Sequence, residues 1–304
     1  MKVLITGASG LLGRATLKVF QSAPDVEVKG LGFTRSTDQL LKLDLLDPEA
    51  VRALIDEFNP DVVVHSAAER RPDAAEENPA KARELNALVP AHLARLAGEK
   101  GFRLIYISTD YVFDGTSPPY KTSDAPNPLQ FYGITKREGE VAVLENSKGQ
   151  GIVLRVPILY GEAEYNSETA VNVLLDVVND KSGKTYKMDT YQTRYPTNVH
   201  DVAVCLLRIA RRFPRSLTSS ELPPSILHFS SKRPFTKYSM CTVMAQALGV
   251  EVSHIIPDGT EPAAGVIRPK DTQLDLTCLE ENGIEWTEEQ SFETWWTNYL
   301  SPSK

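Results

Sequence analysis

The 304-residue sequence lacks the residue patterns that mark several large classes of protein. Its three cysteines lie far apart and outside any CxxC or Cys/His pattern, so neither a disulfide framework nor a structural zinc site is expected. The five histidines are scattered without a metal-ligand spacing such as HExxH, and no metal site is predicted. No GxSxG motif occurs, which argues against the chemistry of serine hydrolases.

Long apolar runs and an excess of basic charge are also missing. No stretch approaches the roughly 18 apolar residues that a membrane-spanning helix needs, and the first apolar run is too short for the core of a signal peptide. The formal net charge of −7 argues against a nucleic-acid partner and against a polybasic membrane anchor. Together with the few cysteines, these absences predict a globular protein of the reducing cytoplasm.

Short apolar runs alternate with segments of helical periodicity through the first half of the chain. This alternation is typical of a parallel sheet whose two faces are both covered by helices. Strands are predicted at residues 2–6, 27–33, 61–66, 103–108 and 152–159. Helices are predicted between them at residues 12–20, 48–58, 80–98 and 132–145.

Beyond residue 160 the pattern is less regular. Helices are predicted at residues 169–179, 201–211, 236–248 and 292–300, and short strands at residues 226–229 and 254–256. The fold class expected is therefore α/β, with a Rossmann-like doubly wound parallel sheet that binds NADP in residues 1–160. A smaller C-terminal α/β lobe of the substrate-binding type is expected in residues 161–304, partly interleaved with the core.

A glycine-rich turn, Thr6-Gly7-Ala8-Ser9-Gly10-Leu11-Leu12-Gly13, follows the first predicted strand and opens a helix. Strand, turn and helix in this order indicate a dinucleotide-binding turn rather than a glycine-rich turn without a ligand. Gly7 permits a sharp turn, Gly10 lets the backbone approach a pyrophosphate, and Gly13 allows the helix to pack closely on the strand. The helix N-terminus offers free N–H groups and partial positive charge to the phosphates.

The end of the second predicted strand indicates which dinucleotide is bound. NAD-preferring sites usually place Asp or Glu there to accept a hydrogen bond from the ribose 2′-hydroxyl. The sequence here is Phe33-Thr34-Arg35-Ser36, without a carboxylate. Arg35 can pair with a 2′-phosphate, helped by the hydroxyls of Thr34 and Ser36, so NADP is the expected cofactor. In the alternative interpretation, Arg35 is a solvated surface charge.

A tyrosine and a lysine, Tyr132 and Lys136, are spaced four residues apart on one predicted helix face. An adjacent ammonium stabilises phenolate, so the pair is expected to lower the pKa of Tyr132 and make it a proton donor or acceptor. Thr109, at the carboxyl end of a buried strand, would be the third member, or Ser108 if the register is shifted by one residue. Alternatively, the tyrosine and lysine form an exposed helix face.

Two segments, Ser108–Gly115 and Tyr132–Glu140, resemble the dTDP-4-dehydrorhamnose reductase branch of the extended short-chain dehydrogenase/reductase superfamily. The superfamily resemblance covers nearly the whole chain. This branch implies hydride transfer from NADPH to the ketone of a nucleotide sugar, with Tyr132 protonating the developing alkoxide. In that case Thr109, Tyr132 and Lys136 are the catalytic residues.

Further segments are similar to a narrower group, the regulatory (beta) subunits of methionine adenosyltransferase. They are residues 65–73, 114–120, 142–146, 157–162, 268–269 and 273–275. Within the first, Glu69-Arg70-Arg71-Pro72 stands where the sugar reductases usually carry an aromatic residue and a Val-Asp motif. This resemblance implies a regulatory subunit that associates with the catalytic subunit and modulates S-adenosylmethionine synthesis, with NADP stabilising a conformation rather than being turned over.

The motifs and the resemblance together imply an NADP site along the carboxyl edge of the sheet. The phosphates would meet Gly7, Ser9, Gly10, Leu11, Leu12 and Gly13; the 2′-phosphate would meet Thr34, Arg35 and Ser36; the adenine side would meet Asp44 and Leu45; and the nicotinamide end would meet Ser66, Arg70, Tyr132, Lys136 and Leu159. The pair Arg70-Arg71 is expected to face an anion rather than to be a plain surface pair.

The sequence leaves two functions open. The preferred hypothesis is the NADP-binding regulatory subunit, whose partner is the catalytic subunit of methionine adenosyltransferase. The alternative is an NADPH-dependent reductase with a nucleotide-sugar or other small-molecule ligand, because its catalytic triad is intact in the sequence. Whether the chain is an enzyme is therefore open, since a fold does not settle a function.

Arg35→Ala is expected to weaken NADP binding much more than NAD binding, because only NADP carries the 2′-phosphate that the guanidinium would meet. Fluorescence titration of the wild-type and variant chains with each dinucleotide measures the two Kd values. An equal loss for both dinucleotides would refute the role given to Arg35.

Overall fold

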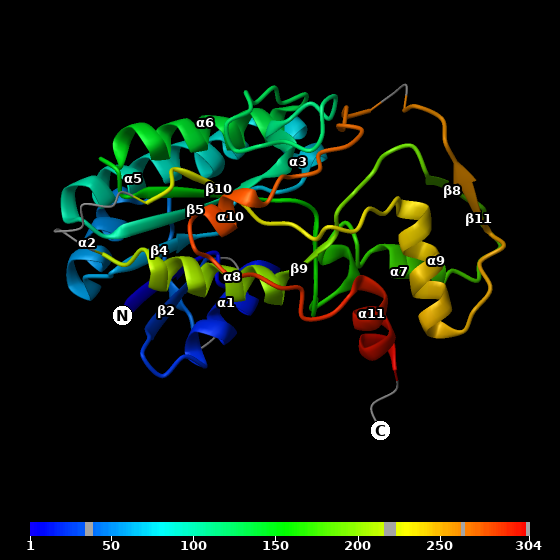
Figure 1. Ribbon diagram of the computed structural model, residues 1–304, viewed down its shortest axis with the longest axis horizontal. Coiled ribbons are helices and arrows are strands. Elements are labelled where there is room, and N and C mark those ends of the chain that lie inside the picture. The colour runs from blue at the N-terminus through cyan, green and yellow to red at the C-terminus, as the bar shows by residue number, and fades with distance from the viewer. Residues whose placement is uncertain (34–38, 216–222, 263–264, 302–304) are drawn as a thin grey trace.

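A seven-stranded parallel sheet forms the centre of the protein (Figure 1), as the computed structural model shows for residues 1–33, 39–215, 223–262 and 265–301. The strand order is β10-β6-β5-β4-β1-β2-β3, so that β1 and β4 are neighbours and the order reverses between them. This confirms the predicted Rossmann-like class. The strands are β1 (Lys2–Thr6), β2 (Glu27–Gly32), β3 (Leu41–Lys42), β4 (Val62–His65), β5 (Arg103–Thr109), β6 (Gly151–Val156) and β10 (Ile226–His228).

Helices cover both faces of this sheet (Figure 1). One face packs against α1 (Leu11–Gln21), α8 (Val199–Arg212) and α10 (Thr277–Glu281). The other packs against α2 (Pro48–Phe58), α5 (Val89–Lys100) and α6 (Phe131–Asn146). Strand β4 shows the reason, because Val62 and Val64 belong to the first core and Val63 to the second, each fully buried. A strand covered on both faces needs apolar side chains on both sides of its pleat, and these three valines provide them.

Most predicted helix and strand limits agree with the structure to within two residues. Helix α2 begins as predicted, with the Asp47 side chain accepting hydrogen bonds from the N–H groups of Glu49 and Ala50 and with Pro48 in the first turn. The strand predicted at residues 152–159 instead ends at Val156, because Pro157 interrupts it.

The helix predicted at residues 80–98 is divided by a π-turn. It consists of α4 (Pro79–Arg83), the π-helical segment η1 (Glu84–Leu88) and α5. Pro90 lacks an N–H group, so the Asn86 carbonyl four residues earlier cannot receive the usual helical hydrogen bond. That carbonyl instead accepts a hydrogen bond from the Tyr106 hydroxyl at 2.9 Å. Gly139 makes room for it, since a Cβ atom there would lie 2.2 Å from the Asn86 oxygen.

A smaller lobe is built around its own apolar core (Figure 1). Its elements are β7 (Leu159–Tyr160), η3 (Asn166–Glu168), α7 (Leu174–Val178), β8 (Tyr186–Asp189), β9 (Thr197–Asn198), α9 (Lys237–Leu248), β11 (Ile255–Asp258) and α11 (Phe292–Leu300). The helix predicted at residues 169–179 is shorter, because the Thr169 hydroxyl accepts hydrogen bonds from the N–H groups of Val171 and Asn172 in a turn. The domain boundary at residue 160 stays a prediction.

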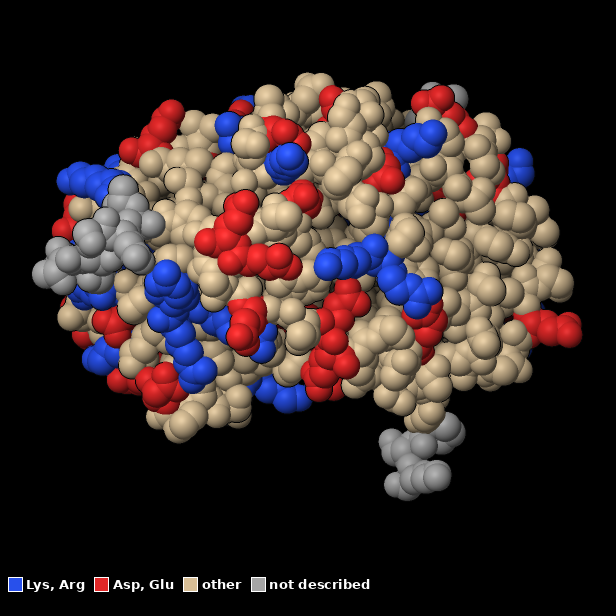
Figure 2. All heavy atoms as spheres, viewed as in Figure 1, with Lys and Arg blue, Asp and Glu red and all other residues tan. Residues whose placement is uncertain are grey.

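The surface drawn in Figure 2 carries acidic and basic side chains intermixed over the face that contains α1 and α8. The acidic surplus is therefore not gathered into one patch on this face. Among the described residues, no helix combines the length and the apolar character needed to cross a bilayer.

A buried ion pair joins the central sheet to helix α6. The Arg155 guanidinium on β6 donates to both carboxylate oxygens of Glu140 on α6, each at 2.8 Å. Ser108 on β5 donates to the same carboxylate at 2.6 Å. Arg155 and Glu140 have no exposed surface, so neither charge is solvated by water. The two groups depend on each other because an uncompensated buried charge is strongly destabilising.

Arg155→Met is expected to reduce the free energy of unfolding by about 3–5 kcal/mol, because it removes the buried charge that pairs with both oxygens of the buried Glu140 carboxylate and leaves only the partly exposed Arg137 as its cationic partner. The double variant Arg155→Met/Glu140→Gln removes both charges and should recover much of the loss. Urea denaturation followed by circular dichroism measures both values. A double variant that is as unstable as Arg155→Met would contradict the account.

Candidate functional site

The carboxyl edge of the parallel sheet gathers the predicted site residues. Strands β1, β3, β4, β5 and β6 end at this edge, so the loops that follow them start there. Helix α6 also begins there. Thr34, Arg35 and Ser36 lie outside the described residues, so the structure does not address the predicted 2′-phosphate contacts. The edge includes the neighbouring strands β1 and β4, where the strand order reverses, and open α/β sheets bind ligands at that point.

The glycine-rich turn after β1 has backbone constraints that only glycine satisfies. Gly7 has a φ of +69°, and a Cβ atom there would lie 2.6 Å from the Ala67 amide nitrogen. A Cβ atom at Gly13 would lie 2.0 Å from the Gly7 carbonyl oxygen. Gly10 precedes α1 in an extended conformation and provides no side-chain cap. The first N–H groups of α1 are thus presented beside a tightly folded turn, an arrangement suited to phosphate.

The segment after β4 places its two arginines differently. Asn86, in the π-turn, accepts a hydrogen bond from the Glu69 N–H at 3.0 Å and donates to the Glu69 carbonyl at 2.9 Å. Arg71 pairs with the Glu69 carboxylate at 3.4 Å and precedes α3 (Pro72–Glu77). Arg70 is exposed, and its charge is close enough to lower the pKa of Tyr132. Of the two arginines, Arg70 is therefore the one whose charge acts on Tyr132.

Tyr132 lies near Thr109, whose side chain is close enough to influence the pKa of the phenol. Burial raises the pKa of Tyr132 well above its usual value, and the nearby Thr109 side chain offsets only part of that rise. The predicted lowering of the Tyr132 pKa was therefore wrong in direction, because desolvation outweighs the nearby charges. The phenol is protonated at neutral pH and is suited to donate a proton. Ser108, the alternative to Thr109, is engaged by Glu140 instead.

Lys136 is directed toward strand β5. Its ammonium donates to the Ile107 carbonyl at 2.7 Å and lies 4.1 Å from the centre of the Tyr106 ring. The side chain is only 2% exposed, and this burial lowers the pKa of Lys136 to about 7 while the Glu140 carboxylate opposes the change. These contacts hold the Lys136 ammonium against β5.

The remaining predicted contacts lie farther along the same edge. The Ser66 hydroxyl donates to the Thr6 carbonyl at 2.7 Å and joins the ends of β1 and β4. Asp44 accepts a hydrogen bond from the Leu46 N–H at 2.9 Å, and Leu45 packs against the sheet core. Leu159 begins β7 and is half-buried against the other core. Ser9, Leu11 and Leu12 are part of the glycine-rich turn and the start of α1.

Sequence reasoning missed two groups that shape the site. Asp110 directly follows Thr109, is 4% exposed, and accepts hydrogen bonds from Thr109 and from Thr272 of the C-terminal part. Burial raises the pKa of Asp110 to about 6. The other group is Asn86, whose side chain holds the Glu69 backbone. Pro90 signals only that the Asn86 carbonyl lacks its usual helical hydrogen bond. Among the described residues, no group of three or more His, Cys, Asp or Glu side chains is arranged to hold a metal ion.

Comparison with known proteins identifies one matching family and three similar proteins. The profile of the RmlD substrate binding domain matches residues 1–297. Methionine adenosyltransferase 2 subunit beta of Rattus norvegicus is 47% identical over 286 residues, which are 93% of this chain and 83% of the relative.

Two crystal structures share the fold. A dTDP-4-dehydrorhamnose reductase of Clostridium acetobutylicum has a TM-score of 0.82 and 28% identity, covering 99% of this chain and 98% of that one. A dTDP-4-dehydrorhamnose reductase of Bacillus anthracis, in complex with NADP, has a TM-score of 0.79 and 23% identity, covering 98% and 97%. The latter similarity concerns the fold alone.

The glycines of the turn provide a matched pair of variants. Gly13→Ala is expected to reduce the free energy of unfolding by about 3 kcal/mol, because its Cβ would meet the Gly7 carbonyl at 2.0 Å. Gly10→Ala places its Cβ 3.3 Å from the same oxygen and should change stability by less than about 1 kcal/mol. Gly10→Ala should nevertheless weaken NADP binding, because the methyl group stands where the backbone would approach the pyrophosphate. Thermal unfolding measures the change in stability, and NADP titration measures the change in affinity. Unchanged NADP affinity in Gly10→Ala would contradict the close contact proposed between the Gly10 backbone and the pyrophosphate.

Proposed function

Because the chain belongs to the RmlD substrate binding domain family and, within it, to the methionine adenosyltransferase 2 beta subunits, we propose that it is an NADP-binding regulatory subunit. Its partner would be the catalytic subunit of methionine adenosyltransferase, whose synthesis of S-adenosylmethionine it would modulate. In this role the chain acts in the cytoplasm.

The observation that carries the proposal is the 47% identity to a beta subunit over 93% of the chain. This similarity is much higher than the 28% identity to the clostridial reductase, although both comparisons cover most of the chain. The replacement of the reductase motif by Glu69-Arg70-Arg71 adds a local difference at the site itself. Family membership is a stronger guide here than the fold, which serves many functions.

The residues at the sheet edge fit NADP. The turn from Gly7 to Gly13 is compact, and the uncapped N-terminus of α1 would bind the pyrophosphate. Arg70 and Tyr132 would line the nicotinamide end of the site. Arg35 would supply the positive charge that meets the 2′-phosphate. Bound NADP can supply or accept a hydride at its nicotinamide. In the regulatory role, the protein residues only bind and orient the dinucleotide, which stabilises one conformation of the chain.

A second candidate function is an NADPH-dependent reductase of a nucleotide-sugar ketone. The closeness of Thr109 to Tyr132 favours it, because these two side chains can meet one substrate oxygen. The raised pKa of Tyr132 keeps its proton available for a developing alkoxide. Lys136, fixed against the Ile107 carbonyl, would position Tyr132 and the nicotinamide ribose.

The regulatory proposal predicts a stable complex with the catalytic subunit of methionine adenosyltransferase from the same organism. Tagged full-length chain and untagged catalytic subunit are mixed at micromolar concentration and separated by size-exclusion chromatography. The two should elute together, and the rate of S-adenosylmethionine formation should change in the complex. The clostridial reductase, which shares the fold, is the control and should elute alone. Separate elution of this chain from the catalytic subunit would end the proposal.

The reductase alternative gives a different result in the same preparation. The purified chain would consume NADPH when a dTDP-4-dehydro-6-deoxysugar is added, and Tyr132→Phe would abolish this consumption because it removes the proton donor. Consumption that is unaffected by Tyr132→Phe would come from a contaminant and would count against the alternative.

A further inference from the structure

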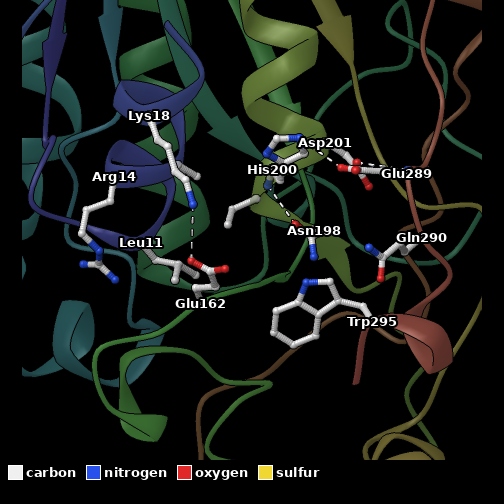
Figure 3. Close-up of a pocket in the computed structure, with 12 residues that line it drawn as sticks. Leu11, Arg14, Lys18, Glu162, Asn198, His200, Asp201, Glu289, Gln290 and Trp295 are labelled. Carbon is white, nitrogen blue, oxygen red and sulfur yellow. Dashed lines mark hydrogen bonds and ion pairs between the residues drawn. The ribbon is translucent and has the colours of Figure 1, made fainter. Parts of the chain in front are cut away.

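A pocket lies where the side of helix α1 meets the start of α8 and the segment before α11 (Figure 3). Its volume is about 390 Å³, which falls within the range of small-molecule sites. Of the predicted nucleotide contacts, only Leu11 lines it. The site is therefore distinct from the glycine-rich turn, although both use α1.

The basic side chains around this pocket are already paired. Arg14 donates to the two carboxylate oxygens of Glu168 at 2.9 and 2.7 Å. Lys18 lies 3.8 Å from Glu162, and the His200 ring lies 3.1 Å from the Glu289 carboxylate. A ligand anion would meet no uncommitted positive side chain among these lining residues.

Asp201 has the opposite property. Its side chain is 6% exposed, and the one hydrogen bond that the described residues give it comes from the Glu289 N–H to Oδ1 at 3.2 Å. Burial raises the pKa of Asp201 to about 6, so the group is still mainly a carboxylate at neutral pH. A buried carboxylate is costly unless a cation or further donors meet it. The Asp201 carboxylate can therefore accept further hydrogen bonds from a ligand in the pocket.

The N-terminus of α8 does not turn this pocket into an anion site. The Asn198 side chain accepts a hydrogen bond from the His200 N–H at 2.8 Å, and the Asp201 carboxylate occupies the same first turn. The helix end is thus capped and already faces a negative charge. Figure 3 shows Asn198, Asp201 and Glu289 gathered on one side of the pocket.

Trp295 supplies an aromatic wall. Its indole stacks on Tyr299, with ring centres 4.6 Å apart, and meets Tyr160 and Trp296 in perpendicular contacts at 5.1 and 4.9 Å. The indole is half-buried and lines the pocket near Asn198 and Gln290 (Figure 3). Indole rings attract planar cations through their π-electrons.

We propose that this pocket binds a small planar organic cation of the amidinium or guanidinium class. The N–H donors of the cation meet the Asp201 carboxylate, and its flat body packs against Trp295. The two arms of such a group match the two oxygens of a carboxylate. The basic side chains Arg14, Lys18 and His200 also line the pocket, and each is paired with a carboxylate other than Asp201.

Benzamidine and its neutral counterpart benzamide test the proposal on the full-length chain. Ligand-observed NMR titration at neutral pH should give benzamidine a Kd on the order of 1 mM, as expected for a fragment of this size. Benzamide should bind at least about tenfold more weakly, because it lacks the charge. Equal binding of the two compounds, or no binding of benzamidine, would overturn the proposal.

Two variants locate the binding. Asp201→Asn should weaken benzamidine binding by about tenfold or more, whereas Asp56→Asn, an exposed acid on α2 outside the pocket, should leave it unchanged. Ala15→Leu lines the pocket with a larger side chain and should abolish binding while keeping helix α1. If Asp201→Asn does not fold, Ala15→Leu alone decides the matter. Binding that survives Ala15→Leu would place benzamidine elsewhere and defeat the proposal.

Discussion

Glu140 carries a carboxylate with no exposed surface, and the geometry of the candidate site depends on how that charge is satisfied. Arg155 from β6, Ser108 from β5 and Arg137 from the preceding turn of α6 all donate to it. Tyr132 and Lys136 precede Glu140 at intervals of four residues, so the three side chains share one face of α6. Fixing Glu140 against the sheet therefore fixes the rotation of α6 and turns Tyr132 toward the end of β5.

The same network extends to the C-terminal part of the chain. The Arg155 guanidinium lies 3.3 Å from Nε2 of His228 on β10, and Nδ1 of that ring lies 3.2 Å from the Asp275 carbonyl. Burial and the Arg155 charge lower the pKa of His228 to about 4, so the ring is neutral and can accept from Arg155. Three residues before Asp275, Thr272 donates to Asp110 beside the site. A single set of polar contacts thus connects the sheet, the site and the C-terminal segment.

Local sequence signals predicted the features that arise within one strand, turn or helix. The glycine-rich turn, the Asp47-Pro48 helix start and the apolar run Val62–Val64 each carry their own physical requirement, and the structure contains all three. The π-turn could not be predicted in this way. Pro90 frees the Asn86 carbonyl, but its partner Tyr106 comes from a different strand. The periodicity of apolar residues along the sequence does not reveal a contact between two separate elements.

The electrostatics of the site were also beyond local signals. The spacing of Tyr132 and Lys136 correctly placed both on one helix face, but it does not report how deeply each side chain is buried. Burial raises the pKa of Tyr132, which is opposite to the expected direction. The Lys136 ammonium donates to a backbone carbonyl. The Asp201 pocket likewise requires α1, α8 and residue 289 to meet, which only the folded chain reveals.

The return of the chain to the central sheet has a mechanical consequence. Helix α8 and strand β10 complete the first core, although the chain has already entered the smaller lobe at β7 and enters it again at α9. The chain therefore passes between the central-sheet part and the smaller lobe several times, rather than through one linker. Any rotation between the parts must therefore change the backbone at several crossings together, and no single linker controls it. A single proteolytic cut between them would leave both halves tied together by the remaining connections.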